Sequence, residues 1–374
     1  MSKKIKKLLI VIIVLVLLVA AYFVITKFVI KNDESTDEKS DNIAVSQVGA
    51  ENIVSFTYKC EDTDNKDLTL VRNSDKEWHY SEDDSFPVNQ TYVTKMAESL
   101  SSVEAERIIS ASEADELSEY GFDNPLVSIS FEEKDGTKHE YYIGNENTST
   151  ENYYFRMDDD ENVYQINADL KVMFMMGLYD LFDMETFPKV EESSFREIDI
   201  KSSDKHLRVK AVVEDDAEEH ITSDDYMEKD ITWYAAKDDE DYKKGNQITL
   251  QAMIDEMTEY SFFRAVDYKI DDDKYKQYGF DNPKAVINVK YQVLDETTAK
   301  LVEVQDGINE VQCDTIDKEY TLYVGNKSND TDYADDYYVY IEGSDKVYTM
   351  ETSVLSRMVD LDIDSYFVTD ISTK

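Results

Sequence analysis

The stretch that decides the fold is Tyr120-Gly121-Phe122-Asp123-Asn124-Pro125, which returns letter for letter as Tyr278-Gly279-Phe280-Asp281-Asn282-Pro283. The two copies lie 158 residues apart, residue 278 against residue 120. A repeat of that period indicates two modules of domain size and argues against a short-period solenoid. The chain is therefore expected to contain one structural plan twice.

Each copy is predicted to form a corner between a short helix and a strand. Acidic segments with helical spacing precede the corners at residues 113–119, where Ser112 is a candidate N-cap, and at residues 271–277. Gly121 and Gly279 stand where a helix ends in a left-handed residue, a conformation that costs glycine least. The proline that follows fixes φ and pushes the residue before it out of the helical region. We interpret all twelve residues as a structural motif, and a binding loop displayed twice is the alternative.

The similarity extends outward from both corners, and its landmarks keep their order. Each copy has a tryptophan, a helix running towards an arginine, the corner, a strand, a glycine-bearing strand, a Val-Tyr strand and a closing apolar helix. The matching positions are Trp78 and Trp233, helices 90–100 and 247–257, Arg107 and Arg264, strands 126–131 and 285–293, Gly144 and Gly325, Tyr164 and Tyr348, and closing helices 168–182 and 351–361. The second copy adds an acidic insertion between Leu294 and Lys318.

These patterns predict an α+β fold of two tandem repeats, each an antiparallel β-sheet or meander with helices packed on one face. Hairpin turns are expected at residues 134–137 and 158–162. The predicted divisions are an N-terminal transmembrane anchor at 1–30, an acidic linker at 31–50, a first module at 51–190 and a second module at 191–370.

The N-terminus predicts a membrane anchor. Four lysines lie among the first seven residues, and residues 8–25 carry no charge. A run of that length can span the hydrocarbon core, and the preceding lysines favour a cytoplasmic N-terminus with the bulk of the chain outside. A cleaved signal peptide ending near Ala21 is the alternative.

Charge and cysteine content limit the possible partners. The formal net charge is −43, from 39 basic and 82 acidic residues, which disfavours binding to nucleic acid or anionic lipid heads. Cys60 and Cys313 could form a disulfide outside the cell, but sequence alone does not pair them.

No motif predicts a catalytic, cofactor-binding or metal-ligating residue. The chain has no Gly-rich phosphate loop, no G-x-S-x-G, no H-E-x-x-H and no C-x-x-C. Its four histidines, which lack a partner histidine at ligand spacing, are interpreted as ordinary surface or sheet residues: His79, His139, His206 and His220. The acidic run at residues 62–67 lacks the glycine and closing glutamate of an EF-hand loop. No cofactor is expected, and whether the protein is an enzyme is left open, with a non-enzymatic role favoured.

The corner motif, the tryptophan-bearing strand and the glycine-bearing strand together resemble the DUF4340 domain, here in two tandem copies. That family's pattern is a Tyr-Gly-Leu/Phe-Asp-x-Pro turn followed by a glycine-bearing strand. The resemblance implies an N-terminal membrane anchor and no known catalytic residues, and some members resemble partners of ABC-type export or gliding-associated systems. We therefore expect a membrane-anchored extracytoplasmic module that binds a protein partner or assists an ABC-type transporter or envelope system. The alternatives are an envelope hydrolase using paired carboxylates and an adhesive module that binds calcium or a wall polymer.

Overall fold

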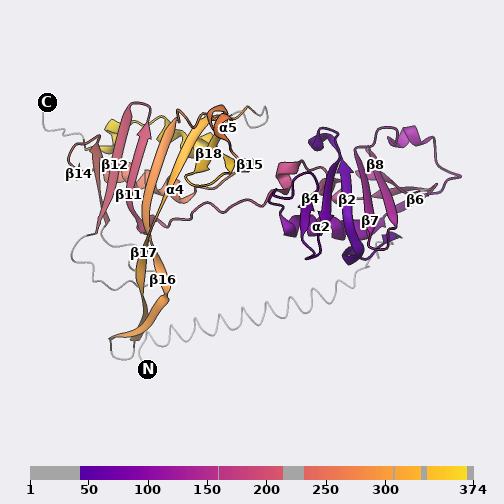
Figure 1. Cartoon of the computed structure of the whole chain (residues 1–374), viewed down its shortest axis with the longest axis horizontal. Helices are drawn as coiled ribbons and strands as arrows, with labels where there is room; N and C mark the ends of the chain where they lie inside the picture. The colour runs from indigo at the N-terminus through magenta and orange to yellow at the C-terminus, as the bar shows by residue number, and fades with distance from the viewer. Residues whose placement is uncertain (1–42, 159, 214–230, 306–307, 330–334, 369–374) are drawn as a thin grey trace, which may run out of the picture. The chain divides into compact units, whose positions relative to one another are not determined.

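The computed structural model describes residues 43–158, 160–213, 231–305, 308–329 and 335–368. The chain divides into two compact units, one within Met1–Glu82 and Thr91–Gly177, the other made of Asp83–Gln90 and Leu178–Lys374. Antiparallel sheets dominate both units, with few and short helices (Figure 1). The predicted module boundaries at residues 51, 190, 191 and 370 stay predictions.

Within the described residues, the first unit's main sheet has eight antiparallel strands in the order β4-β3-β2-β7-β8-β9-β10-β6. Their bounds are β2 Ile53–Lys59, β3 Leu68–Arg72, β4 Trp78–Tyr80, β6 Arg107–Ile109, β7 Val127–Glu133, β8 Lys138–Asn147, β9 Asn152–Met157 and β10 Val163–Ile166. A separate two-stranded ribbon joins β1 (Ile43–Gln47) to β5 (Ser102–Ala105). The helical segments of the first half are η1 Ala50–Asn52, η2 Glu61–Thr63, α2 Gln90–Ser101, η3 Leu117–Tyr120 and α3 Asp169–Phe174.

The second unit's sheet repeats this order strand for strand, as β13-β12-β11-β16-β17-β18-β19-β15, and adds β14 at one edge. The bounds are β11 Phe195–Ser202, β12 Lys205–Val213, β13 Ile231–Lys237, β14 Lys243–Lys244, β15 Arg264–Asp267, β16 Ala285–Gln305, β17 Ile308–Lys327, β18 Tyr337–Ile341 and β19 Val347–Met350. The helical segments are η4 Leu178–Leu181, η5 Glu192–Ser194, α4 Gln247–Thr258, α5 Asp272–Gln277, α6 Thr352–Val359 and η6 Ile363–Tyr366. The predicted duplication is thus visible in sheet topology.

The core follows the two periodicities expected of helices and strands. Helix α2 buries Val93, Met96, Ala97 and Leu100, and α4 buries Leu250, Met253, Ile254 and Met257, both at the spacing of one helical face. Strand β7 buries every second residue, at Val127, Ile129 and Phe131, and β16 does the same from Ala285 to Tyr291. Each sheet therefore buries one continuous face.

Two helix predictions around the first corner are wrong. Residues 113–119 do not form a helix, and Ser112 is not an N-cap: the corner is preceded only by the 3₁₀-helix η3, which Glu116 precedes. The segment lacks an apolar stripe to bury, because Leu117 is 38% exposed, and so short a helix is marginal without one. In the second copy the prediction is confirmed, since α5 begins after Asp271, whose carboxylate accepts from the Lys274 amide.

The helix at residues 90–100 is confirmed but does not continue towards Arg107, and the closing helix 168–182 is not continuous. Helix α2 ends at Ser101, and Arg107 lies in strand β6, as Arg264 lies in β15. The predicted closing helix 168–182 is broken into α3 and η4. The Tyr58 hydroxyl donates to the Met176 carbonyl at 2.7 Å, and Gly177 follows, so the chain turns there instead of continuing the helix.

The predicted anchor and linker lie outside the described residues, apart from residues 43–50. Within the part of the chain that the structure describes, no helix is long and apolar enough to cross a membrane.

Candidate functional site

Both corners have the predicted left-handed glycine. Gly121 has φ +84° and Gly279 has φ +82°. A Cβ built on either glycine would lie 2.5 Å from the side chain of the asparagine beside it, Asn145 in the first copy and Asn326 in the second. No other residue type fits these positions without displacing the asparagine.

The corner backbone rests directly on the glycine of the following strand. A Cβ on Gly144 would lie 2.1 Å from the Tyr120 carbonyl oxygen, and one on Gly325 would lie 2.1 Å from the Tyr278 carbonyl oxygen. In the second copy that carbonyl accepts a hydrogen bond from the Asn326 amide at 2.7 Å. The landmark glycines of the two strands are therefore required by close backbone approach.

The aromatic residues of each corner pack on the same sheet positions. The Tyr120 ring lies 4.7 Å from that of Tyr154, and the Tyr278 ring lies 4.8 Å from that of Tyr338. The remaining polar residues of the motif point outward: Asp123, Asn124, Asp281 and Asn282 are exposed, and Pro125 and Pro283 are half-buried. The described contacts of the motif thus belong to its own fold, and the geometry brings no reactive pair together there.

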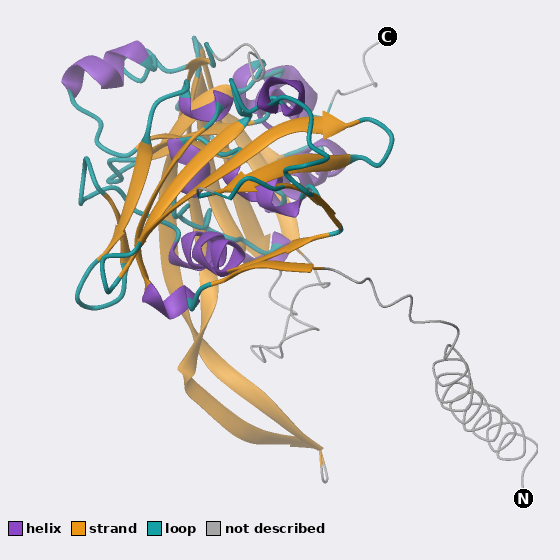
Figure 2. Cartoon of the chain, turned by 90° about the vertical axis from the view of Figure 1, so that its right-hand side faces the viewer, coloured by secondary structure: helices purple, strands orange, loops and turns teal. Residues whose placement is uncertain are grey.

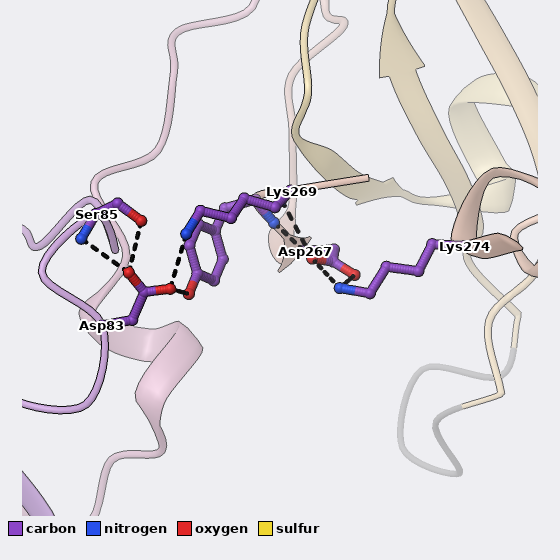
Figure 3. Close-up of polar contacts among 6 residues, drawn as sticks. Asp83, Ser85, Asp267, Lys269 and Lys274 are labelled. Atoms are coloured by element: carbon purple, nitrogen blue, oxygen red, sulfur yellow. Dashed lines mark hydrogen bonds and ion pairs between the residues drawn. The ribbon is translucent and has the colours of Figure 1, made fainter. Parts of the chain in front are cut away.

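The second corner holds a buried carboxylate that the first one lacks. Asp267 is 4% exposed and accepts from the Tyr278 hydroxyl at 3.0 Å. It also accepts from the Lys274 ammonium at 2.8 Å (Figure 3). It also accepts from the backbone amides of Tyr268 and Lys269. In the first copy the corresponding position, opposite Val163, is Ile109. Burial and the carboxylate raise the pKa of the Tyr278 phenol above its usual value.

A second carboxylate, Asp83, closes the same network and lies in the same unit. Its Oδ2 accepts from the Lys269 ammonium at 2.8 Å and from the Tyr268 hydroxyl at 2.7 Å, and its Oδ1 accepts from Ser85 (Figure 3). The Lys269 bond, with help from Ser85 and Tyr268, holds the pKa of Asp83 well below its usual value. Phe86 adds an edge-on ring contact to Tyr268 at 5.0 Å. These contacts fasten residues 83–90 within the second unit, and sequence reasoning missed them because their partners lie far along the chain.

A family model described as "Domain of unknown function (DUF4340)" matches the chain twice, over residues 78–236 and 233–371. The chain belongs to the DUF4340 family. This confirms the predicted tandem resemblance. Comparison with curated proteins found no match, and neither did comparison with solved structures.

The histidines of this DUF4340 protein lie in strands where they are described. His139 in β8 bridges two carboxylates, with Nε2 3.1 Å from Glu133 and Nδ1 3.1 Å from Asp158. Partial burial lowers the pKa of His139, but the bonds to Asp158 and Glu133 outweigh it, so the pKa is raised. His206 pairs with Asp199 at 2.9 Å, His79 contacts Asn73, and His220 lies outside the described residues.

The described residues can be searched for a metal site and for a disulfide. Among the residues that the structure describes, no group of three or more His, Cys, Asp or Glu side chains is placed to hold a metal ion. The pairing of Cys60 and Cys313 was left open, and in the structure both are free thiols, Cys60 buried and Cys313 half-buried.

The second DUF4340 copy also extends its hairpin into an arm, residues 292–318. Strand β16 has 21 residues and β17 has 20, against 7 in β7 and 10 in β8. In the described registers, β11 pairs with β16 only as far as Tyr291, and β18 pairs with β17 only from Leu322 onward. In the described backbone ladder the arm strands pair with each other and run on beyond the sheet (Figures 1 and 2). At the base of the arm, the Gln292 side chain accepts from Arg196 of β11 at 2.8 Å.

The arm exposes apolar side chains to solvent. Leu301 is 75% exposed and Val311 is 53% exposed, and the two residues lie directly opposite each other in the ladder. The wider spacing between the corner and the glycine-bearing strand of the second copy locates the insertion in the sequence, but does not predict that it forms strands. The alternation of Val311 and Cys313 with polar residues is the signal that could have found one of its strands.

Proposed function

We propose that this protein is a non-enzymatic, membrane-anchored extracytoplasmic module that binds a protein partner and assists an ABC-type transporter or another envelope system. The observation that carries the proposal is the arm of the second unit. The rest of each module is accounted for by its own packing, whereas the arm presents apolar surface that its own fold leaves in water.

The arm is not needed to close the sheet. The first copy makes the equivalent connection with the four-residue turn 134–137, in which the Gly136 amide donates to the Glu133 carbonyl. An isolated two-stranded ribbon is marginal in water, and its open edges and apolar residues are surfaces on which other chains dock. A long ribbon with such residues is therefore better explained by a partner than by the stability of this fold.

The sequence supports placing that partner at a membrane. Four lysines and an uncharged run of 18 residues, 8–25, precede the acidic remainder of the chain. A single-pass anchor with a cytoplasmic N-terminus would hold both modules outside the cytoplasm, beside membrane proteins. The family resemblance to partners of export systems points to the same class of partner by analogy.

The test is co-purification of the full chain from membranes solubilised in mild detergent. We expect one membrane or envelope protein to be recovered in near-stoichiometric amount, and to bring this chain with it when the tag is placed on the partner instead. The matched control carries an unrelated single-pass helix in place of residues 1–30. Recovery of no stoichiometric protein, in mild detergents and after cross-linking, would refute the proposal.

A further inference from the structure

The geometry of the arm points to its apolar face as the docking surface, and we infer that the occupant is a protein whose apolar patch is bordered by lysine or arginine. This inference rests on the proposed function, because it names the surface and the partner chemistry of the same interaction. The face consists of Leu294, Leu301, Val311 and Cys313.

The strand register places these four residues on one side of the ribbon. Val311, Cys313 and Thr315 alternate along β17 and so share a face. Leu301 lies opposite Val311, and Leu294 lies opposite Thr315, which brings both leucines to that face. Between them the ladder bulges, and Thr298 Oγ1 accepts from the Asp314 amide at 2.8 Å, so the ribbon stays joined across the bulge.

The exposed fractions show that the face is left open by the chain's own fold. Leu294 is 39% exposed, in addition to the larger exposures of Leu301 and Val311. The sheet strands on either side, β11 and β18, end their described pairing before the face begins. The described arm strands pair with each other but not with the rest of the sheet along this face. Packing within the sheet therefore does not explain an exposed apolar row there.

Charge decides which kind of occupant fits. By sequence, residues 292–318 contain seven acidic residues and two lysines. The acidic residues Glu296, Asp314 and Asp317 are exposed on the arm. An anionic membrane would be repelled, and so would a second copy of a chain with net charge −43. A basic rim around an apolar patch complements both properties of the arm.

The test is site-specific photo-cross-linking of the full chain in its native membranes. A photoreactive amino acid replaces Leu301, and in the matched control it replaces Val172, which is 56% exposed on α3. We expect one discrete protein adduct from position 301 and none of the same mass from position 172. The cross-linked segment of the partner should be apolar with flanking lysine or arginine, and the yield should fall roughly threefold or more between 50 and 500 mM salt.

Two variants sharpen the result, with the photoreactive group now at Val311. Leu301→Asp should lower the adduct yield about tenfold, as expected for a residue at the centre of an interface. The doubly neutralised variant Asp314→Asn with Asp317→Asn should lower it about threefold, whereas Val172→Asp should leave it unchanged. Circular dichroism and limited proteolysis of each variant establish that the fold is retained.

The outcomes separate this inference from the proposed function. An adduct of twice the chain's mass, a lipid adduct, or equal adducts from positions 301 and 172 would overturn the inference. If the stoichiometric partner is recovered but never cross-links to the arm, the docking surface is wrong and the proposed function stands. If no partner is recovered and no adduct forms, both fail.

Discussion

The two hairpins that follow the corners share a register and differ in length. Phe131 lies opposite His139 in the first hairpin, and Val289 lies opposite Tyr320 at the equivalent place in the second. Two residues further on, the first hairpin ends at Glu133 and turns, whereas the second continues as the arm. The comparison shows that a short hairpin is enough for the sheet, so the arm is a separable addition.

The two corners share their glycines and differ in one buried carboxylate. Both require a glycine at the turn and a glycine on the strand beneath it, but only the second adds the buried Asp267. The glycines are common to both corners because both folds require them. Asp267 and the arm are found in the second copy alone, so they are features that the shared fold does not require. Substitutions in the shared and in the copy-specific features should therefore differ in their effects.

The largest effect is expected from filling the contact beneath a corner. Gly144→Ala and Gly325→Ala each place a methyl group 2.1 Å from a backbone carbonyl oxygen, so each should destabilise its own unit by about 3 kcal/mol or more. Denaturant titration of the full chain, followed by circular dichroism, measures this. Gly136→Ala is the control: its φ of +89° is strained for alanine but it has no atom within 4 Å, so about 1 kcal/mol is expected. Equal losses at Gly325 and Gly136 would contradict the close-approach explanation.

A smaller effect should distinguish the two corners. Asp267→Asn removes the buried carboxylate that accepts from the Tyr278 hydroxyl and the Lys274 ammonium, which should destabilise the second unit by about 1–2 kcal/mol. Asp115→Asn, near the first corner, should leave the free energy of unfolding nearly unchanged. The Tyr120 hydroxyl accepts from the backbone amide of Asp115, which this substitution keeps. Thermal unfolding of both variants provides the measurement, and a neutral Asp267→Asn would mean that the carboxylate does not hold the corner.

The end of the first hairpin should respond to pH. The pKa of His139 is raised above 6.5 in the folded state, so its stabilising contribution is complete below about pH 6.5 and is lost as pH rises through the folded pKa. We expect a loss of about 1–3 °C in the first unit's melting temperature between pH 6 and 8 that is missing in His139→Gln. Glu133→Gln should flatten the same pH profile in part, and an unchanged profile in both variants would exclude His139 as its source.

The smallest effect on stability is expected from removing the arm. Replacing residues 295–314 by Asn-Gly joins Leu294 to Thr315, which already lie opposite each other, and gives the second hairpin a tight turn like the first. The second unit should change in stability by less than about 1 kcal/mol, because the described residues of the removed segment pair only with each other. Co-purification of the partner from solubilised membranes should be lost while melting is nearly unaltered; a loss of several kcal/mol would make the arm part of the fold.

Sequence alone predicted the parts of the fold that local chemistry determines. The structure confirms the left-handed glycines, the turn at residues 134–137 and helices α2, α4 and α5. These features depend on capping residues, apolar spacing and glycines that lie close together in the sequence. The break at Met176 was missed because it depends on a hydroxyl more than a hundred residues away, on Tyr58. The Asp83 and Asp267 network escaped for the same reason, since a carboxylate among 82 acidic residues carries no signal before its partners are placed.

The arm shows a different limit. The repeat spacing indicates an insertion, but a strand pair with many charged residues resembles a solvated linker in composition. Only the register, in which Leu301 lies opposite Val311 and Leu294 lies opposite Thr315, shows which of the apolar residues share a face.

The burial of so many phenols has a consequence at alkaline pH. Burial raises the pKa of Tyr141 and of Tyr179 to about 12, whereas a phenol in an unfolded chain ionises near 10. The contribution of these rings to the free energy of unfolding is complete below about pH 10. It is lost as the pH rises through the folded pKa of about 12. Ultraviolet absorbance at phenolate wavelengths should therefore show, beyond the gradual ionisation of the half-buried tyrosines, a step that coincides with loss of structure and reports the state of the sheets.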